Sequence, residues 1–103
     1  MKKFCRNPEA LWREEDIPKK EALDALEKGE DASGLGTSII LLHGDMHSLN
    51  ILGTEIWKLC EGKTPDEIVQ QLEKSFDVER DVLTADVNSF LASLIRLGLV
   101  YEE

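Results

Sequence analysis

The segment TSIILLHGDMHSLN, residues 37–50, constrains the fold of this chain more than any other part of the sequence. Residues 38–43 are rich in branched aliphatic side chains, which are typical of β-strands. Gly44 and Asp45 suit the two-residue turn of a tight β-hairpin. The segment therefore predicts two antiparallel strands joined by that turn.

The predicted turn decides which side chains share a face of the hairpin. It pairs His43 with Met46, and further along the strands it pairs Ile40 with Leu49. One face then carries Ile40, Leu42, His47 and Leu49, and the other carries Ile39, Leu41, His43 and Met46. Both faces are apolar enough to need cover, and the helices after the hairpin can cover one of them. We expect a helix near residues 18–28, or a second subunit in a homodimer, to cover the other.

Helix signals follow the hairpin directly. Asn50 is the candidate N-cap of a first helix, which we expect Gly62 to end. Thr64, Pro65 and Glu67 have the spacing of a capping box, which predicts the start of a second helix. Helical spacing of apolar residues then predicts one shared core, made of Leu52, Ile56, Leu72, Phe76, Phe90 and Leu94.

A third helix, from about residue 79 to residue 97, carries a wide apolar arc and is followed by Gly98. Its apolar side chains span about 160° of the helix surface, and they are Leu83, Val87, Phe90, Leu91, Leu94, Ile95 and Leu97. A helix that packs against a single core needs a narrower apolar arc than this. The shoulder of Leu91 and Ile95, with Thr84 and Asn88 beside it, could therefore face a partner. Complete burial of the helix in a small domain explains the arc equally well.

The residues before the hairpin predict two further elements. Residues 8–15 favour a short strand, and the next residues favour a helix with Asp16 as N-cap and Gly29 just past its end. A loop follows over residues 29–36. The predicted fold is an α+β, winged-helix-like single domain over residues 1–103. In it, a three-stranded antiparallel sheet packs on three helices, with an extra N-terminal helix.

The charge of the chain excludes some partners. It has 12 Lys and Arg against 21 Asp and Glu, and a formal net charge of -9. Such a field repels nucleic acid and anionic lipid surfaces, so we expect neither nucleic acid nor a membrane as partner. The start, MKKFCRNPEALWREE, lacks the long apolar region of a signal peptide, and no run approaches the length of a membrane span. We expect a cytoplasmic protein.

Chemical motifs are absent from the sequence. It contains no Gly-rich phosphate loop, no nucleophile elbow and no HExxH zinc motif. The run HGDMH could supply metal ligands, but the predicted register points His43 and His47 to opposite faces, which disfavours a metal site. Cys5 and Cys60 form no CxxC pattern, and Cys60 falls on an apolar helix face. We therefore predict no catalytic residue, no cofactor and no enzyme activity.

An ordered set of residues around LCEGKTPDEIV is more specific than any single element. The set consists of Leu49, Asn50, Gly53, Ile56, Trp57, Leu59, Cys60, Gly62, Thr64, Glu67, Ile68, Val69, Leu72, Phe76, Asp86, Val87, Phe90, Leu91, Leu94, Gly98 and Leu99. Over roughly residues 38–101 this pattern resembles the PqqD family of peptide chaperones. Residues 1–34 depart from it, because a helix-like insertion follows the first strand. The chain also resembles the variant of this family that is found beside radical SAM maturases.

The resemblance implies a RiPP recognition element, which is a domain that binds ribosomally made peptides destined for post-translational modification. Such a domain binds the leader segment of the precursor peptide and presents its core to a partner, here a radical SAM enzyme. The leader would add a strand to the hairpin's second strand and rest on the third helix. The implied peptide-binding residues are Met46, His47, Ser48, Leu49, Thr84, Val87, Asn88, Leu91 and Ile95.

A second function remains open on the same residues. A hairpin followed by three helices also suits a winged-helix module that regulates or dimerises without binding a peptide. The third helix is not basic, so DNA reading is disfavoured in either case.

Overall fold

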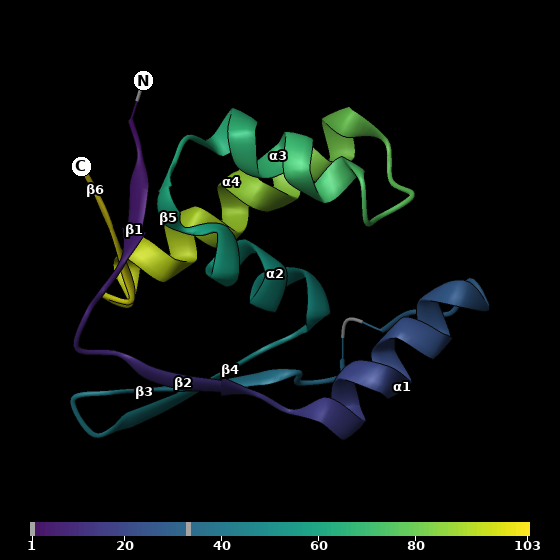
Figure 1. The fold of residues 1–103 in the computed structure, drawn as a ribbon, viewed down its shortest axis with the longest axis horizontal. Coiled ribbons are helices and arrows are strands. Elements are labelled where there is room, and N and C mark those ends of the chain that lie inside the picture. The colour runs from purple at the N-terminus through teal and green to yellow at the C-terminus, as the bar shows by residue number, and fades with distance from the viewer. Residues whose placement is uncertain (1, 33) are drawn as a thin grey trace. The chain divides into compact units, whose positions relative to one another are not determined.

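The computed structural model describes residues 2–32 and 34–103 and has an α+β fold (Figure 1). Met1 and Ser33, which belong to the predicted N-terminal segment and loop, lie outside the described residues. In chain order the elements are β1 (Phe4–Arg6), β2 (Leu11–Glu14), α1 (Asp16–Glu27), β3 (Ser38–Leu42), β4 (Asp45–Leu49), α2 (Ile51–Leu59), β5 (Glu61–Lys63), α3 (Pro65–Glu73), α4 (Arg80–Arg96) and β6 (Val100–Glu102).

These elements form two compact units, each with its own three-stranded antiparallel sheet. Residues 8–55 contain the sheet β2-β3-β4, helix α1 and the start of α2. Residues 56–103, with the N-terminal residues up to Asn7, contain the sheet β5-β1-β6, the end of α2, and helices α3 and α4. We call them the hairpin unit and the helical unit.

The hairpin of the hairpin unit forms with a different turn from the predicted one. Leu42 pairs with Asp45, so the two turn residues are His43 and Gly44, not Gly44 and Asp45. Their φ angles are 49° and 87°, and a turn with positive φ at both central residues matches the twist of the flanking strands. The prediction failed because it assigned positive φ to glycine alone, whereas His43 also adopts it.

This correction shifts the register by two residues and leaves the faces unchanged, because side chains alternate with a period of two. Ile40 now pairs with His47, and Leu41 pairs with Met46. Ile40, Leu42 and Leu49 are buried on one face, while Leu41 and Met46 are exposed on the other. Helix α1 was one of two expected covers for that second face, yet the face remains exposed.

The elements before the hairpin form largely as predicted. Strand β2 pairs antiparallel with β3, and α1 is followed by Gly29 at a φ of 73°. Asp16 is the first helical residue instead of the N-cap, which is Glu15 with an extended backbone. An acidic side chain is favourable in the first turn as well as at the cap, because both positions lie at the positive end of the helix dipole.

The sheet β5-β1-β6 of the helical unit was not predicted. Each of its strands has three residues, which is too short to display an alternating pattern. Phe4 pairs with both Lys63 and Glu102. Gly62 lies within β5 instead of ending α2, which stops at Leu59. Its φ of 74° explains why a glycine is needed there.

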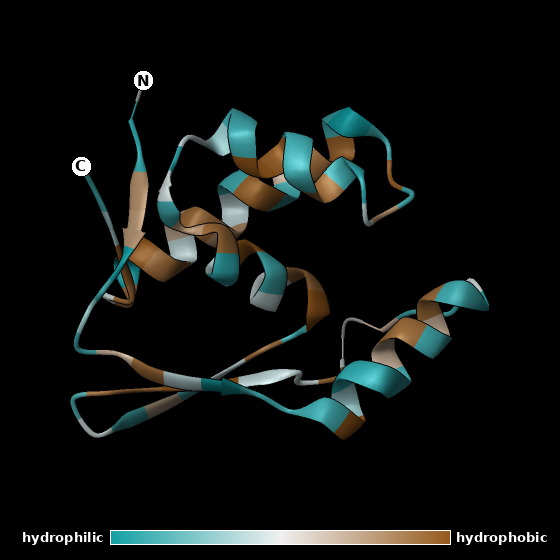
Figure 2. Cartoon of the chain, in the orientation of Figure 1, coloured by the Kyte–Doolittle hydropathy of each residue, from teal (hydrophilic) through white to brown (hydrophobic). Residues whose placement is uncertain are grey.

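Helices α3 and α4 pack against each other and form the core of the helical unit. In Figure 2 both ribbons alternate between brown and teal as they turn, as amphipathic helices do. Of the predicted core, Ile56, Leu72 and Leu94 are buried. The prediction is wrong for three residues that are only half-buried: Leu52, which lies in the hairpin unit, Phe76, which lies beyond the end of α3, and Phe90.

Two predicted helix caps are confirmed in atomic detail. The backbone N–H of Gly53 donates to Asn50 Oδ1 at 2.9 Å. At the capping box, the Glu67 N–H donates to Thr64 Oγ1 at 3.3 Å, and the Thr64 N–H donates to Glu67 Oε1 at 3.0 Å. Three N–H groups at the starts of α2 and α3, which the helices themselves cannot satisfy, therefore have partners.

Removing the capping hydroxyl should destabilise the protein. We expect Thr64→Ala to lower the free energy of unfolding by about 0.5–2 kcal/mol at neutral pH, because it leaves one helix N–H without its acceptor. Thr64→Ser keeps the hydroxyl and should retain most of the stability. Urea unfolding followed by circular dichroism measures both, and equal losses in the two variants would contradict a capping role.

The same box predicts a pH dependence. Hydrogen bonds from the Thr64 backbone and side chain lower the pKa of Glu67 from its ordinary value of 4.5. The ionised carboxylate therefore stabilises the fold above the ordinary pKa, and this contribution is lost as the pH falls through the lower, folded-state pKa. Glu67→Gln should lack this part of the acid destabilisation. A wild-type pH profile identical to that of Glu67→Gln would contradict the assignment.

Candidate functional site

The open edge of strand β4 is the first component of the candidate site. In the order β2-β3-β4, β4 stands at the end of the sheet, and within residues 2–32 and 34–103 it pairs with β3 alone. An edge strand presents N–H and C=O groups that another extended chain can pair with.

The register shows which backbone groups face outward. The pair that closes a two-residue hairpin, here Leu42 and Asp45, is a hydrogen-bonded pair, and such pairs recur at every second position. Asp45, His47 and Leu49 therefore direct their backbone groups toward β3. The N–H and C=O groups of Met46 and Ser48 point away from the sheet and are the ones that an added strand would use.

The side chains of β4 differ in access. Met46 is 69% exposed, Ser48 is exposed, His47 is half-buried and Leu49 is buried. The first three of these predicted site residues are therefore accessible. Leu49 belongs to the interior, so that its side chain has a structural role.

A buried hydroxyl cluster, which the sequence did not indicate, holds the end of β4 against the first turns of α2. Thr54 Oγ1 lies 2.8 Å from Thr37 Oγ1 and 2.7 Å from Ser38 Oγ, and it also donates to the Leu49 carbonyl at 3.3 Å. The Thr37 N–H donates to the same carbonyl at 2.7 Å. Because all three hydroxyls are buried and bonded, they stiffen the end of the open edge.

Gly36 is a second residue that sequence reasoning missed. A Cβ atom at this position would come within 2.3 Å of Ser48 Oγ. A larger residue at position 36 would therefore push the Ser48 side chain aside. Only the spatial proximity of these two residues reveals the constraint, because they are separated along the chain by most of the hairpin.

Helix α4 is the second predicted component, and it belongs to the helical unit, whereas β4 belongs to the hairpin unit. Val87 and Leu91 are 0% and 2% exposed, so both belong to the buried stripe of α4. Thr84 and Ile95 are half-buried, and Asn88 is exposed. Of the predicted site residues on α4, Thr84, Asn88 and Ile95 are therefore accessible.

The cysteines lie in surroundings that keep the thiols protonated. Cys60 is fully buried, which raises the pKa of its thiol to about 12, and the thiol donates to the Ile56 carbonyl at 3.2 Å. Cys5 donates to Glu103 at 2.9 Å, and this hydrogen bond raises its pKa. A thiolate nucleophile is therefore disfavoured at both positions at neutral pH.

The histidines of HGDMH have separate surroundings. His43 Nε2 lies 2.6 Å from Glu9 Oε2 at the hairpin turn, while His47 is a half-buried residue within β4. Over the described residues, no group of three or more His, Cys, Asp or Glu side chains is placed to hold a metal ion. In the same part of the chain, no helix combines the length and apolar character needed to cross a bilayer.

Comparison with known proteins yields one family and two similar folds. The family model described as Coenzyme PQQ synthesis protein D (PqqD) matches residues 20–100. The structure "TbiB1 in Complex with the TbiA(beta) Leader Peptide" superposes with a TM-score of 0.67 at 22% identity, covering 93% of each chain. "Lasso peptide synthetase B1 complexed with the leader peptide" has a TM-score of 0.66 at 20% identity, covering 96% of this chain and 98% of that one. A search of curated proteins gave no match.

Proposed function

Because this chain belongs to the PqqD family, we propose that it binds the leader segment of a ribosomally made precursor peptide and presents that peptide to a maturation enzyme. The two similar structures are both described as complexes with leader peptides, which supports a peptide ligand. Our candidate for the enzyme is a radical SAM maturase. The chain itself would act as a non-catalytic, cytoplasmic adaptor.

The observation that carries this proposal is the open edge of β4. An extended leader can add to that edge as a further strand, because the outward groups of Met46 and Ser48 supply donors and acceptors with the right spacing. The buried hydroxyls of Thr37, Ser38 and Thr54 hold the end of this edge in place before any peptide binds. A preformed edge lowers the entropy that binding must remove.

Selectivity must come from side chains, because backbone pairing is nearly independent of sequence. We propose that apolar leader residues rest on Ile95, the accessible apolar residue among the predicted α4 site residues, because Val87 and Leu91 are buried. Thr84 and Asn88 would add hydrogen bonds. The winged-helix-like fold class predicted from the sequence is part of this proposal. The net charge of -9 favours a leader that carries Lys or Arg.

Titration of the isotopically labelled protein with candidate leader peptides tests the proposal. We expect backbone amide signals of residues 46–48 to shift, together with those of Thr84, Asn88 and Ile95, because these groups would contact the bound strand. The matched control is a scrambled peptide of the same composition and charge. If the leader moves only signals of α2, or if the scrambled peptide binds equally well, the proposed site is wrong.

A further inference from the structure

Gly36 lies just before strand β3 in the hairpin unit, on the side of β4 that faces β3. The next residue, Thr37, donates its N–H to the Leu49 carbonyl at 2.7 Å, and that carbonyl is directed toward β3. A Cβ atom at Gly36 would come within 2.3 Å of Ser48 Oγ and 3.7 Å of Ser48 Cβ. Because the oxygen is much closer than the carbon that bears it, the Ser48 hydroxyl points toward Gly36 and away from the open edge of β4.

The backbone of Gly36 gives no other reason for a glycine. Its φ is not positive, unlike the φ of Gly29 and Gly44, so a residue with a side chain can adopt the same φ. Among the described residues, an added Cβ would meet only the two Ser48 atoms within 4 Å. The Ser48 hydroxyl is therefore the group that a side chain at position 36 would displace.

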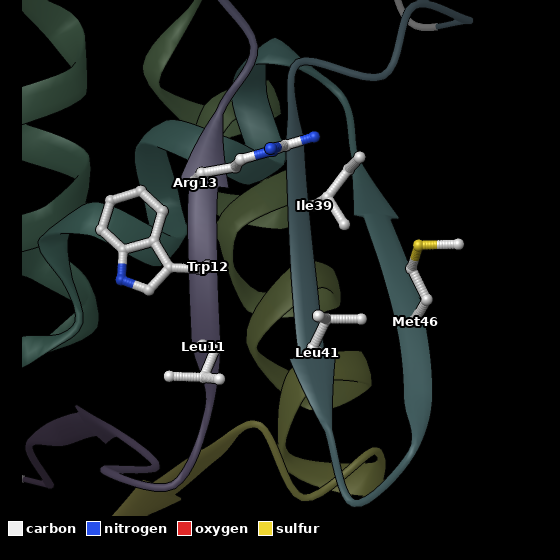
Figure 3. A pocket seen from close by; sticks show the side chains of 6 residues that line it. All are labelled: Leu11, Trp12, Arg13, Ile39, Leu41 and Met46. Carbon is white, nitrogen blue, oxygen red and sulfur yellow. The ribbon is translucent and has the colours of Figure 1, made fainter.

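The Ser48 side chain has room to move when it is displaced. Ser48 is exposed and pairs with Ile39, so its side chain lies on the same face of the sheet as that residue. Figure 3 shows this face, on which Ile39, Leu41 and Met46 lie beside one shallow hollow. The hydroxyl can therefore turn to another staggered position about the Cα–Cβ bond without meeting the core.

We propose that Gly36 is a positioning residue for the leader-binding edge. It leaves the space that holds the Ser48 hydroxyl on the β3 side, away from the outward N–H and C=O groups of Ser48. This inference rests on the proposed function, because it concerns the edge to which the leader would add. A side chain at position 36 turns the hydroxyl toward that edge. There it hydrogen-bonds with the neighbouring backbone, as serine side chains commonly do, and occupies a group that the leader needs.

Gly36→Ala should weaken leader binding by about 3- to 10-fold, as expected when one neutral hydrogen bond is lost. Ser48→Ala alone should leave the affinity nearly unchanged, because the hydroxyl points away from the leader in the wild type. The double variant Gly36→Ala/Ser48→Ala should bind as the wild type does, since the displaced hydroxyl is gone. A purely structural effect at position 36 would persist in the double variant, so this rescue separates the two explanations.

The matched control is Gly34→Ala, which makes the same substitution in the same loop. A Cβ atom at Gly34 would meet no atom of the described residues within 4 Å, so this variant should bind the leader as the wild type does. Isothermal titration calorimetry with one leader peptide measures all four variants. Circular dichroism confirms that each of them is folded.

The three-bond couplings between the Hα and Hβ protons of Ser48 give a second readout, which needs no peptide. They should change in Gly36→Ala and keep their wild-type values in Gly34→Ala, because they report the position of the hydroxyl. Unchanged couplings in Gly36→Ala would overturn the proposal. So would equal affinities of Gly36→Ala and the wild type, or a loss that Ser48→Ala does not rescue. In these cases the wild type still binds the leader and the proposed function stands, whereas a wild type that binds no leader overturns both.

Discussion

Met46→Pro should weaken leader-peptide binding by about 5- to 150-fold, which corresponds to about 1–3 kcal/mol for a backbone group left without its partner. Proline has no N–H, and the N–H of Met46 is one of the groups that the register directs away from β3. The substitution therefore removes a donor that only an added strand would use. Edge strands accept proline at such outward positions, so the hairpin should remain folded.

Met46→Ala is the matched control, because it shortens the same side chain and keeps the N–H. It should change the affinity only a few-fold. Isothermal titration calorimetry of both variants with the same leader peptide separates the two contributions, and circular dichroism verifies their folding. If Met46→Ala is as damaging as Met46→Pro, the side chain rather than the strand edge carries the binding, and the strand-addition mode is incorrect.

Trp57→Ala should lower the free energy of unfolding by about 3–5 kcal/mol, a large share of the about 5–15 kcal/mol that is typical of small proteins. Trp57 is fully buried, and the Arg6 guanidinium lies 5.8 Å from the centre of its ring. Removing the indole opens a cavity in the helical unit and deprives Arg6 of its ring contact, although Arg6 keeps its ion pair with Glu61.

Trp12→Ala supplies the comparison, because it removes the same side chain from a partly exposed position. Trp12 is 36% exposed on the edge strand β2, so its loss should lower the free energy of unfolding by less than the loss of the fully buried Trp57 does. Urea unfolding followed by far-ultraviolet circular dichroism measures both variants without relying on tryptophan fluorescence. A loss below about 1 kcal/mol for Trp57→Ala would show that this position tolerates collapse of the cavity.

The candidate site shows where sequence reasoning reached its limit. The edge strand at residues 46–49 follows from the hairpin pattern, and the predicted and observed faces agree even though the register moved by two residues. The apolar arc of α4 was equally compatible with a partner and with burial. The structure buries Val87 and Leu91, and a helical wheel cannot show this because it contains no neighbouring elements.

Several local features of this protein follow from its sequence alone. The capping box at Thr64, the cap at Asn50 and the helix end at Gly98 were all predictable, because each depends on hydrogen bonds between residues only a few positions apart. Two other features emerge only in the folded chain. They are the second sheet, in which Phe4 pairs with Glu102, and the approach of Gly36 to Ser48. Those features depend on contacts between residues distant along the chain, for which a three-residue strand or a single glycine carries no periodic signal.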